Sequence, residues 1–260
     1  MKNKCLLLAA LVALAGLLPQ SKAEVMLGAA ENFAVLASST VTSTGNTVIN
    51  GDLGVSPGTS ITGFYPPGIV NGTTYAGGAV AQQARDDVFT AYLSLSNEVA
   101  VQNLTGVDLG GLTLVAGVRN FTSSAQLTGT LTLDAQGDSN ARFDFQIGST
   151  LTTAGSSSIL LIHGAQAENV FWQVGSSATL GANTVFSGSI LADQSITLVT
   201  GASLSGRALA LNAAVTLDDN IITVPVAIPE PSTFCLLACC AVGVRTWRRM
   251  AVWRRKVARS

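Results

Sequence analysis

NTVFSGSILA, residues 183–192, is one copy of a short repeat that recurs as NTVINGDLGV at residues 46–55 and as ASLSGRALAL at residues 202–211. When the copies are aligned on their glycine, these apolar residues coincide: Ile49, Phe186 and Leu204 before the glycine, and Leu53, Ile190 and Ala208 after it. Polar or small residues lie between them: Asn50, Ser187 and Ser205, then Asp52, Ser189 and Arg207. Side chains alternate between the two faces of a strand, so we expect the apolar set to be buried and the polar set exposed. A strand repeat with one buried face predicts stacked coils, the architecture of a β-solenoid.

Most of the remaining chain also reads as short strands, with turn residues about every eight to twelve positions. Besides the repeats, the predicted strands are residues 33–37, 40–42, 112–115, 127–133, 141–147, 158–162, 170–174 and 215–217. No linker or shift in composition divides this region, which indicates a single mainly-β domain spanning residues 24–226.

One interval has a different periodicity. Apolar residues from Ala81 to Val99 recur every three or four positions, which predicts an amphipathic helix from Ala79 to about Asn103, ending before Gly106. We expect this long helix to pack alongside the solenoid and to cover one of its apolar surfaces.

The charge and the cysteine positions of the central domain argue against nucleic-acid binding and against disulfide bonds. Residues 24–225 contain four arginines and fourteen acidic residues, a net charge of −10. We therefore expect that this domain does not bind nucleic acid, since phosphates require clustered cations. All four cysteines lie near the two ends of the chain, so we expect no disulfide in the central domain.

The two ends read as targeting signals. Lys2 and Lys4 precede an apolar stretch at residues 5–18, and small residues end at Ala23, which indicates a signal peptide over residues 1–23. At the other end, residues 227–260 contain Pro229-Glu230-Pro231, an uncharged run and a basic flank. A simple tail anchor is one interpretation of that segment.

The C-terminal segment closely resembles the PEP-CTERM sorting signal of Gram-negative bacteria. That resemblance implies transient membrane contact, processing by an exosortase-type enzyme, and delivery to the cell surface, outer membrane or extracellular matrix.

Four stretches of the central domain resemble the microbial ice-binding protein family of the β-solenoid type. They are INGDLGVSPG at 49–58, LDAQGDSNARFDF at 133–145, GAQAENVFWQVG at 164–175 and TGASLSGRALA at 200–210. The resemblance covers residues 27–225. It implies a right-handed, three-faced β-helix whose coils are out of sequence order, with one long helix alongside, and a flat regular face that adsorbs to ice.

The ice face of this family often carries the pattern Thr-Ala/Gly-x-Thr/Asn. Residues 44–47 match it, while residues 153–156 and 200–203 end in serine. Threonine suits such a face, because its β-branch is stiff and its hydroxyl can bind ordered water. The expected ice-binding residues are Thr44, Thr47, Thr153, Ser156, Thr179, Thr184, Thr200 and Ser203. The alternative interpretation is that these are turn and strand residues of an ordinary solenoid.

Residues suited to catalysis or metal binding are sparse, so we expect no catalytic site, no metal and no cofactor. His163 is the only histidine and is interpreted as a turn residue. Asp134, Asp138 and Asn140 miss the spacing of a calcium loop and are interpreted as a hairpin turn.

Three functions follow in order of preference. The first is an exported, non-enzymatic ice-binding protein whose partner is the ice crystal surface and which inhibits ice growth or recrystallisation. The alternative is a structural or adhesive matrix protein that binds extracellular polysaccharide. The last is a polysaccharide-cleaving enzyme, which needs clustered acids or a basic groove.

Overall fold

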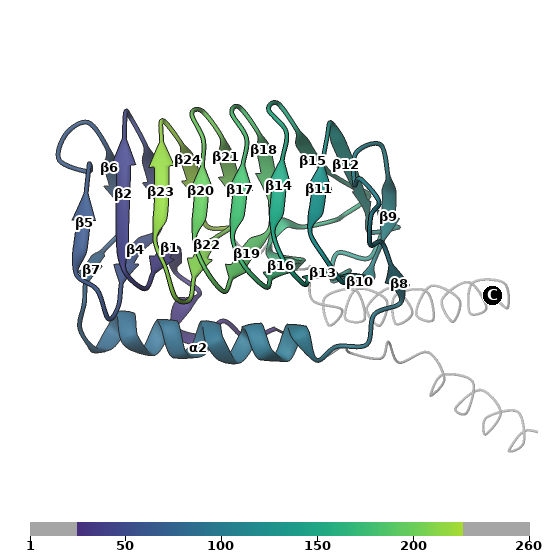
Figure 1. Cartoon of the computed structure of the whole chain (residues 1–260), viewed down its shortest axis with the longest axis horizontal. Helices are drawn as coiled ribbons and strands as arrows, with labels where there is room; N and C mark the ends of the chain where they lie inside the picture. The colour runs from purple at the N-terminus through teal and green to yellow at the C-terminus, as the bar shows by residue number, and fades with distance from the viewer. Residues whose placement is uncertain (1–24, 226–260) are drawn as a thin grey trace, which may run out of the picture. The chain divides into compact units, whose positions relative to one another are not determined.

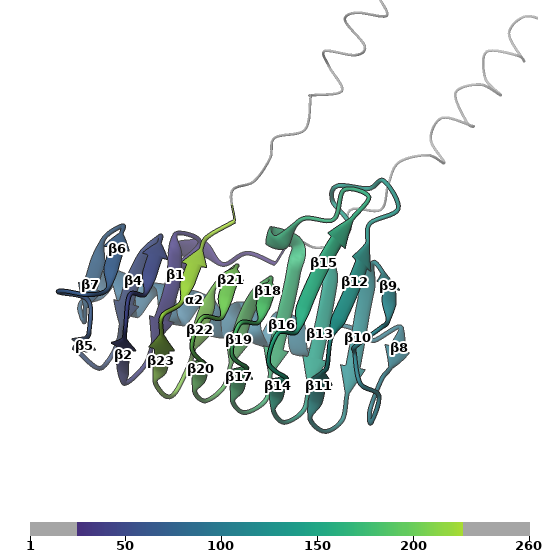
Figure 2. The same cartoon turned by 90° about the horizontal axis from the view of Figure 1, so that it is seen from above.

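Three parallel β-sheets form the walls of a solenoid in the computed structural model, which describes residues 25–225 (Figures 1 and 2). The predicted signal peptide and sorting segment lie outside the described residues. The mainly-β, three-faced solenoid expected from the sequence is confirmed.

Sheet A has nine strands, in the order β7 (Thr74–Ala76), β4 (Asp52–Val55), β1 (Phe33–Ala37), β22 (Ala208–Ala210), β19 (Ser189–Ala192), β16 (Val170–Val174), β13 (Phe143–Ile147), β10 (Gly117–Phe121) and β8 (Gln102–Asn103). Sheet B has seven, in the order β11 (Ala125–Leu127), β14 (Leu151–Thr153), β17 (Ala178–Leu180), β20 (Ile196–Leu198), β23 (Val215–Asp218), β2 (Thr40–Thr44) and β5 (Ser60–Thr62). Sheet C has eight, in the order β6 (Ile69–Asn71), β3 (Val48–Asn50), β24 (Ile221–Thr223), β21 (Ser203–Ser205), β18 (Val185–Ser187), β15 (Ser158–Ile162), β12 (Thr130–Asp134) and β9 (Thr113–Val115). Two short 3-10 helices, η1 (Gly28–Ala30) and η2 (Ala167–Asn169), complete the described structure together with the α-helix α2 (Ala79–Ser96).

The coils are stacked out of sequence order, as expected. Strands β1 to β7 coil towards one end of the stack, and α2 then carries the chain to the other end (Figure 1). Strands β8 to β24 coil back until β22, β23 and β24 pair with β1, β2 and β3. We call this line of pairing the seam, because it joins the N-terminal coils (β1–β7) to the C-terminal coils (β8–β24).

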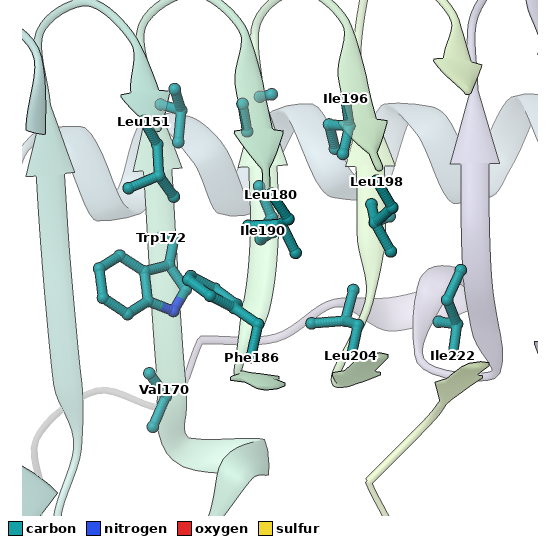
Figure 3. Close-up of a cluster of buried hydrophobic side chains, with 14 of the residues drawn as sticks. Leu151, Val170, Trp172, Leu180, Phe186, Ile190, Ile196, Leu198, Leu204 and Ile222 are labelled. Carbon is teal, nitrogen blue, oxygen red and sulfur yellow. The ribbon is translucent and has the colours of Figure 1, made fainter. Parts of the chain in front are cut away.

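The core is built from the apolar positions of the repeat. Phe186 lies opposite Leu204, and Leu204 lies opposite Ile222 (Figure 3). Ile222 lies opposite Ile49, and each of the four side chains is at most 1% exposed. The buried face predicted from the repeat is therefore confirmed. Full burial of such side chains stabilises the fold by about 1.5–3 kcal/mol each.

Three aromatic residues, Phe145, Trp172 and Phe186, pack against one another in this core. The rings of Phe145 and Trp172 stack with centroids 3.9 Å apart, and Phe186 packs against Trp172 at 5.0 Å. The indole N–H of Trp172 donates to the Ser187 carbonyl at 3.0 Å, so the buried ring has no unsatisfied donor.

The polar positions of the repeat are less exposed than expected. Ser187, Ser189 and Arg207 are all buried. Arg207 does point away from the core, but its guanidinium donates to the Glu31 carbonyl at 3.0 and 2.8 Å and to the Ser189 hydroxyl at 3.2 Å. The N-terminal segment therefore covers this part of sheet A, and Arg207 bonds to backbone and hydroxyl oxygens there.

Helix α2 packs on sheet A but is shorter than predicted. Its buried residues pack in one cluster with residues of sheet A such as Phe33, Phe171 and Leu191. The helix ends at Ser96, and Val99, expected to be inward, is 87% exposed. Gln146 on β13 donates its side-chain amide to the carbonyls of Leu95 and Glu98, both at 2.7 Å, which ties the end of the helix to sheet A. No helix within residues 25–225 is long and apolar enough to cross a membrane.

The strand predicted at residues 127–133 is in fact two. Strand β11 ends at Leu127 in sheet B, and β12 begins at Thr130 in sheet C. Gly129, with φ of +88°, lies at the corner between them. Because α2 covers sheet A, sheets B and C remain as the two open faces of the solenoid (Figure 1).

Candidate functional site

Sheet B carries a column of threonines on its outer face. One residue of each sheet B strand lies opposite one residue of the next in an unbroken line, which aligns Gln126, Thr152, Thr179, Thr197, Thr216, Thr42 and Thr62. The six threonines are exposed or half-exposed. We call them the threonine column; Gln126 occupies the position beyond its last member.

The alternation of each strand fixes the direction of these side chains. Thr179 lies between Ala178 and Leu180, and Thr197 lies between Ile196 and Leu198; these four apolar neighbours are buried in the core. The side chain between two inward residues must point outward. Adjacent members of the column are therefore about 4.7–4.9 Å apart, the spacing of neighbouring strands.

A second outer column lies beside the first. It consists of the residues two positions earlier in each coil: Ser124, Thr150, Ser177, Ser195, Ala214, Thr40 and Ser60. The Thr150 hydroxyl donates to that of Ser124 at 2.8 Å, and the hydroxyls of Ser177 and Ser195 lie 3.0 Å apart. We call this set the hydroxyl column. Its distance from the threonine column along each strand is about 6.6–6.8 Å.

The surface of sheet B is almost free of charge. Asp218, at the end of β23, is the only charged residue in its seven strands. Its carboxylate accepts hydrogen bonds from the hydroxyls of Thr200 and Thr44, which lower the pKa of Asp218. Within its seven strands, sheet B is thus a regular array of hydroxyl and methyl groups with one ordered carboxylate, at the end of β23.

The structure does not bring the eight sequence-predicted residues together on one surface. Thr179 belongs to the threonine column. Thr44 ends β2 and Thr200 follows β20; both are exposed, but their hydroxyls donate to Asp218. Ser156 is exposed in a turn, with φ of +57°, and Ser203 lies on sheet C.

The other three predicted residues point into the solenoid. Thr47, Thr153 and Thr184 are at most 4% exposed, and the hydroxyls of Thr153 and Thr184 lie 2.9 Å apart inside the corner between sheets B and C. The reason is that each predicted four-residue pattern spans this corner. Its first and last residues therefore do not lie in one strand, so the alternation of a strand does not relate their directions and they need not face the same side.

The eight expected residues leave out five members of the column: Thr42, Thr62, Thr152, Thr197 and Thr216. The missed signal is a two-residue pattern. Every threonine of the column directly follows an apolar residue that begins or lies in a short strand, as in Leu151-Thr152 and Val215-Thr216.

Two other predicted features lie at the corner between sheets C and A. His163 is exposed with φ of +50°, and its Nδ1 lies 2.8 Å from an Asp134 carboxylate oxygen. Asp134 and Asp138 accept hydrogen bonds from the backbone N–H groups of Gln136 and Asn140, which is the geometry of Asx turns. The turn interpretation is confirmed, but the turn joins parallel strands of two sheets and is not a hairpin. Within residues 25–225, no three His, Cys, Asp or Glu side chains are grouped as metal ligands would be.

Comparison with known proteins identifies the family to which this solenoid belongs. A family model described as Ice-binding-like matches residues 35–223. An ice-binding protein from Nostoc sp. (strain HG1) is 57% identical over 221 residues, which cover 84% of this chain and 81% of that protein. The crystal structure of an ice-binding protein from an Antarctic biological consortium has a TM-score of 0.77 and 49% identity, covering 81% of this chain and 95% of that one. That of an ice-binding protein from the Antarctic ascomycete Antarctomyces psychrotrophicus has a TM-score of 0.75 and 46% identity, covering 78% and 98%. Because the family match spans most of the chain and the relatives share its whole solenoid, this chain belongs to the Ice-binding-like family.

Proposed function

We propose that this chain is an ice-binding protein that adsorbs to ice through sheet B and so inhibits ice growth or recrystallisation without enzymatic activity. The observation that carries the proposal is the threonine column, six outward threonines in register on six adjacent strands. Its relatives named above are all called ice-binding proteins.

The physical basis is a match between two periodic arrays. Ice presents water molecules at fixed positions, so a protein gains most from contacts that repeat in register. Stacked parallel strands hold the threonines about 4.7–4.9 Å apart, and the β-branch restricts χ1. Each threonine then offers a hydroxyl that can bind a water molecule and a methyl group that packs beside one.

The proposed site replaces the eight residues expected from the sequence. Thr179 is part of the proposed site. Thr47, Thr153 and Thr184 are not, because they are buried and cannot contact ice. The proposed ice-contacting residues are the threonine column, with the hydroxyl column beside it: Thr42, Thr62, Thr152, Thr179, Thr197 and Thr216, flanked by Thr40, Ser60, Ser124, Thr150, Ser177 and Ser195.

A bulky substitution in the middle of the column tests the proposal. Thr179→Tyr would lift the flat face away from an ice plane, and we expect thermal hysteresis and recrystallisation inhibition to be lost. The matched control is Thr132→Tyr, since Thr132 is also a half-exposed, central residue of a parallel strand, but on sheet C. Equal activity of the two variants would refute sheet B as the site.

The proposal extends to export. A signal peptide over residues 1–23 and a PEP-CTERM signal over residues 227–260 would place the protein at the cell surface, outer membrane or extracellular matrix of a Gram-negative bacterium. The sequence features Lys2, Lys4 and Pro229-Glu230-Pro231 support this. Mass spectrometry of the full chain made in an exosortase-bearing host should find residues beyond the Pro-Glu-Pro motif removed. Replacing that motif by three alanines should keep them. An intact C-terminus in the unchanged protein would contradict exosortase processing.

A further inference from the structure

The threonine column is assembled from two parts of the chain that are far apart in sequence. Thr42 and Thr62 belong to the N-terminal coils, whereas Thr152, Thr179, Thr197 and Thr216 belong to the C-terminal coils. The two parts meet where Thr42 lies opposite Thr216, at the seam. The column is continuous only if the N-terminal coils are held in register with the C-terminal coils.

Three consecutive residues hold the seam at the corner between sheets B and C. The Thr44 hydroxyl donates to Asp218 at 2.7 Å, and the backbone and side-chain N–H groups of Asn46 donate to one oxygen of Asp219 at 2.5 and 3.3 Å. The Asn220 N–H donates to the Thr47 hydroxyl at 3.2 Å. We call residues 218–220 and 44–47 together the clasp.

The clasp also reaches the coil on its other side. The second carboxylate oxygen of Asp218 accepts from the Thr200 hydroxyl, and the fully buried Asn220 donates its amide to the carbonyls of Val199 and Ala202, both at 3.0 Å. Asp218 therefore connects three successive coils: that of β20, that of β23 and that of β2.

The fit at the clasp is tight. Gly45 has φ of +68°, and a Cβ atom on it would lie 2.3 Å from a carboxylate oxygen of Asp219. Other corners between sheets B and C are held differently: in the end coil, Asp108 accepts from the backbone N–H groups of Gly110 and of Thr128 in the next coil. One of them uses the hydroxyl pair of Thr153 and Thr184 instead.

We infer that Asp218 is a positioning residue for ice adsorption, one that keeps the two parts of the threonine column in register across the seam. This inference rests on the proposed function. Asp218 acts through the threonines it aligns, because each of its two carboxylate oxygens already accepts a threonine hydroxyl. Removing the carboxylate frees the N-terminal coils to shift relative to the C-terminal coils, so Thr42 and Thr62 no longer extend the ordered array.

The experiment compares thermal hysteresis of the full chain and four variants: Asp218→Ala, Asp193→Ala, Thr42→Tyr and the double variant Asp218→Ala/Thr42→Tyr. Asp193 is the matched control, because its carboxylate accepts from Asn212 at 2.9 Å and so links two coils on one side of the seam only. We expect the thermal hysteresis of Asp218→Ala to fall to that of Thr42→Tyr. The double variant should show the same hysteresis as either single variant, and Asp193→Ala should show that of the unchanged protein.

Two outcomes would overturn the inference. One is unchanged hysteresis in Asp218→Ala while Thr42→Tyr is impaired. The other is an additive loss in the double variant, since Asp218 would then act elsewhere. If Asp218→Ala does not fold, Asp219→Ala removes the Asn46 contacts instead and should give the same pattern. Failure of the proposed function is distinguishable, because either the unchanged protein would show no thermal hysteresis, or Thr179→Tyr and Thr42→Tyr would both show as much as the unchanged protein.

Discussion

The outer faces of sheets B and C share one backbone geometry but present different chemistry. Sheet C also aligns one outward residue per coil, including Ile69, Val48, Ile221, Ser203 and Val185 in register. Here aliphatic side chains dominate, and Ile69, Ile221 and Val185 are more than half exposed. On sheet B the equivalent positions are threonines.

The polar residues of sheet C differ as well. Asn71 donates to the Asn50 side-chain oxygen at 2.9 Å, and Asn50 donates to the Thr223 hydroxyl at 3.0 Å. These groups satisfy one another along the stack. The comparison teaches that regular coil spacing is common to both faces and cannot by itself select ice, so the identity of the outward side chain has to decide.

Removing the shared core should cause the largest effect, and on both faces at once. Trp172 is fully buried between Phe145 and Phe186, so Trp172→Ala should destabilise the fold by about 3–5 kcal/mol through a cavity. Thermal or denaturant unfolding measures the loss. An unfolding free energy unchanged within about 1 kcal/mol would contradict this view of the core.

A charged side chain placed on sheet B or on sheet C should show which of the two faces contacts ice. Thr197→Lys introduces a hydrated, mobile ammonium into the threonine column and should abolish thermal hysteresis. Val185→Lys places the same group on sheet C and should leave hysteresis unchanged. Both positions are at the surface, so unfolding free energies should change by no more than about 0.5 kcal/mol. Loss of hysteresis in both variants would assign ice contact to sheet C as well.

Extending the column should give a smaller gain. Gln126 lies opposite Thr152 and is exposed, so Gln126→Thr adds a seventh threonine in register. We expect a modest rise in thermal hysteresis. The corresponding change on sheet C, Ser203→Thr, should have no effect, and a drop in hysteresis for Gln126→Thr would show that the glutamine itself contributes.

The smallest expected effect is the pH dependence of the clasp. Hydrogen bonds from Thr200 and Thr44 lower the pKa of Asp218 in the folded protein. Its stabilising contribution is therefore present above the unfolded-state pKa of about 3.9 and is lost as pH falls through the folded-state value. The difference in unfolding temperature between the unchanged protein and Asp218→Asn should be present at pH 6 and shrink below about pH 4. A difference independent of pH would contradict a role for the carboxylate charge.

The fold was predictable from the sequence because buried apolar residues recur with the period of a strand or of a helix. The repeat around Gly51, Gly188 and Gly206 identified the inward residues, and the spacing of Ala81, Ala84 and Val88 identified the helix. The end of that helix was not predictable, because it depends on Gln146, a residue of a distant strand.

The site was predictable only in part, because the outward direction of a side chain changes with every residue. Thr153 was predicted and is buried, while its neighbour Thr152 is in the threonine column. Thr44 was predicted and is bound to Asp218, while Thr42 is in the column. A shift of one residue moves a side chain to the opposite face, and the position of each corner is not visible in a four-residue pattern.

The return path of the chain through α2 also affects how the solenoid can come apart. Linear repeat proteins usually fray from the repeats that carry their chain termini. Here Val25 and Pro225 enter and leave away from both ends of the stack, and the last coils, at β5–β7 and at β8–β9, are made of internal chain. Neither end can peel away as a free tail, so opening must begin where the two parts of the chain meet, between β23 and β2 of the proposed ice-binding face.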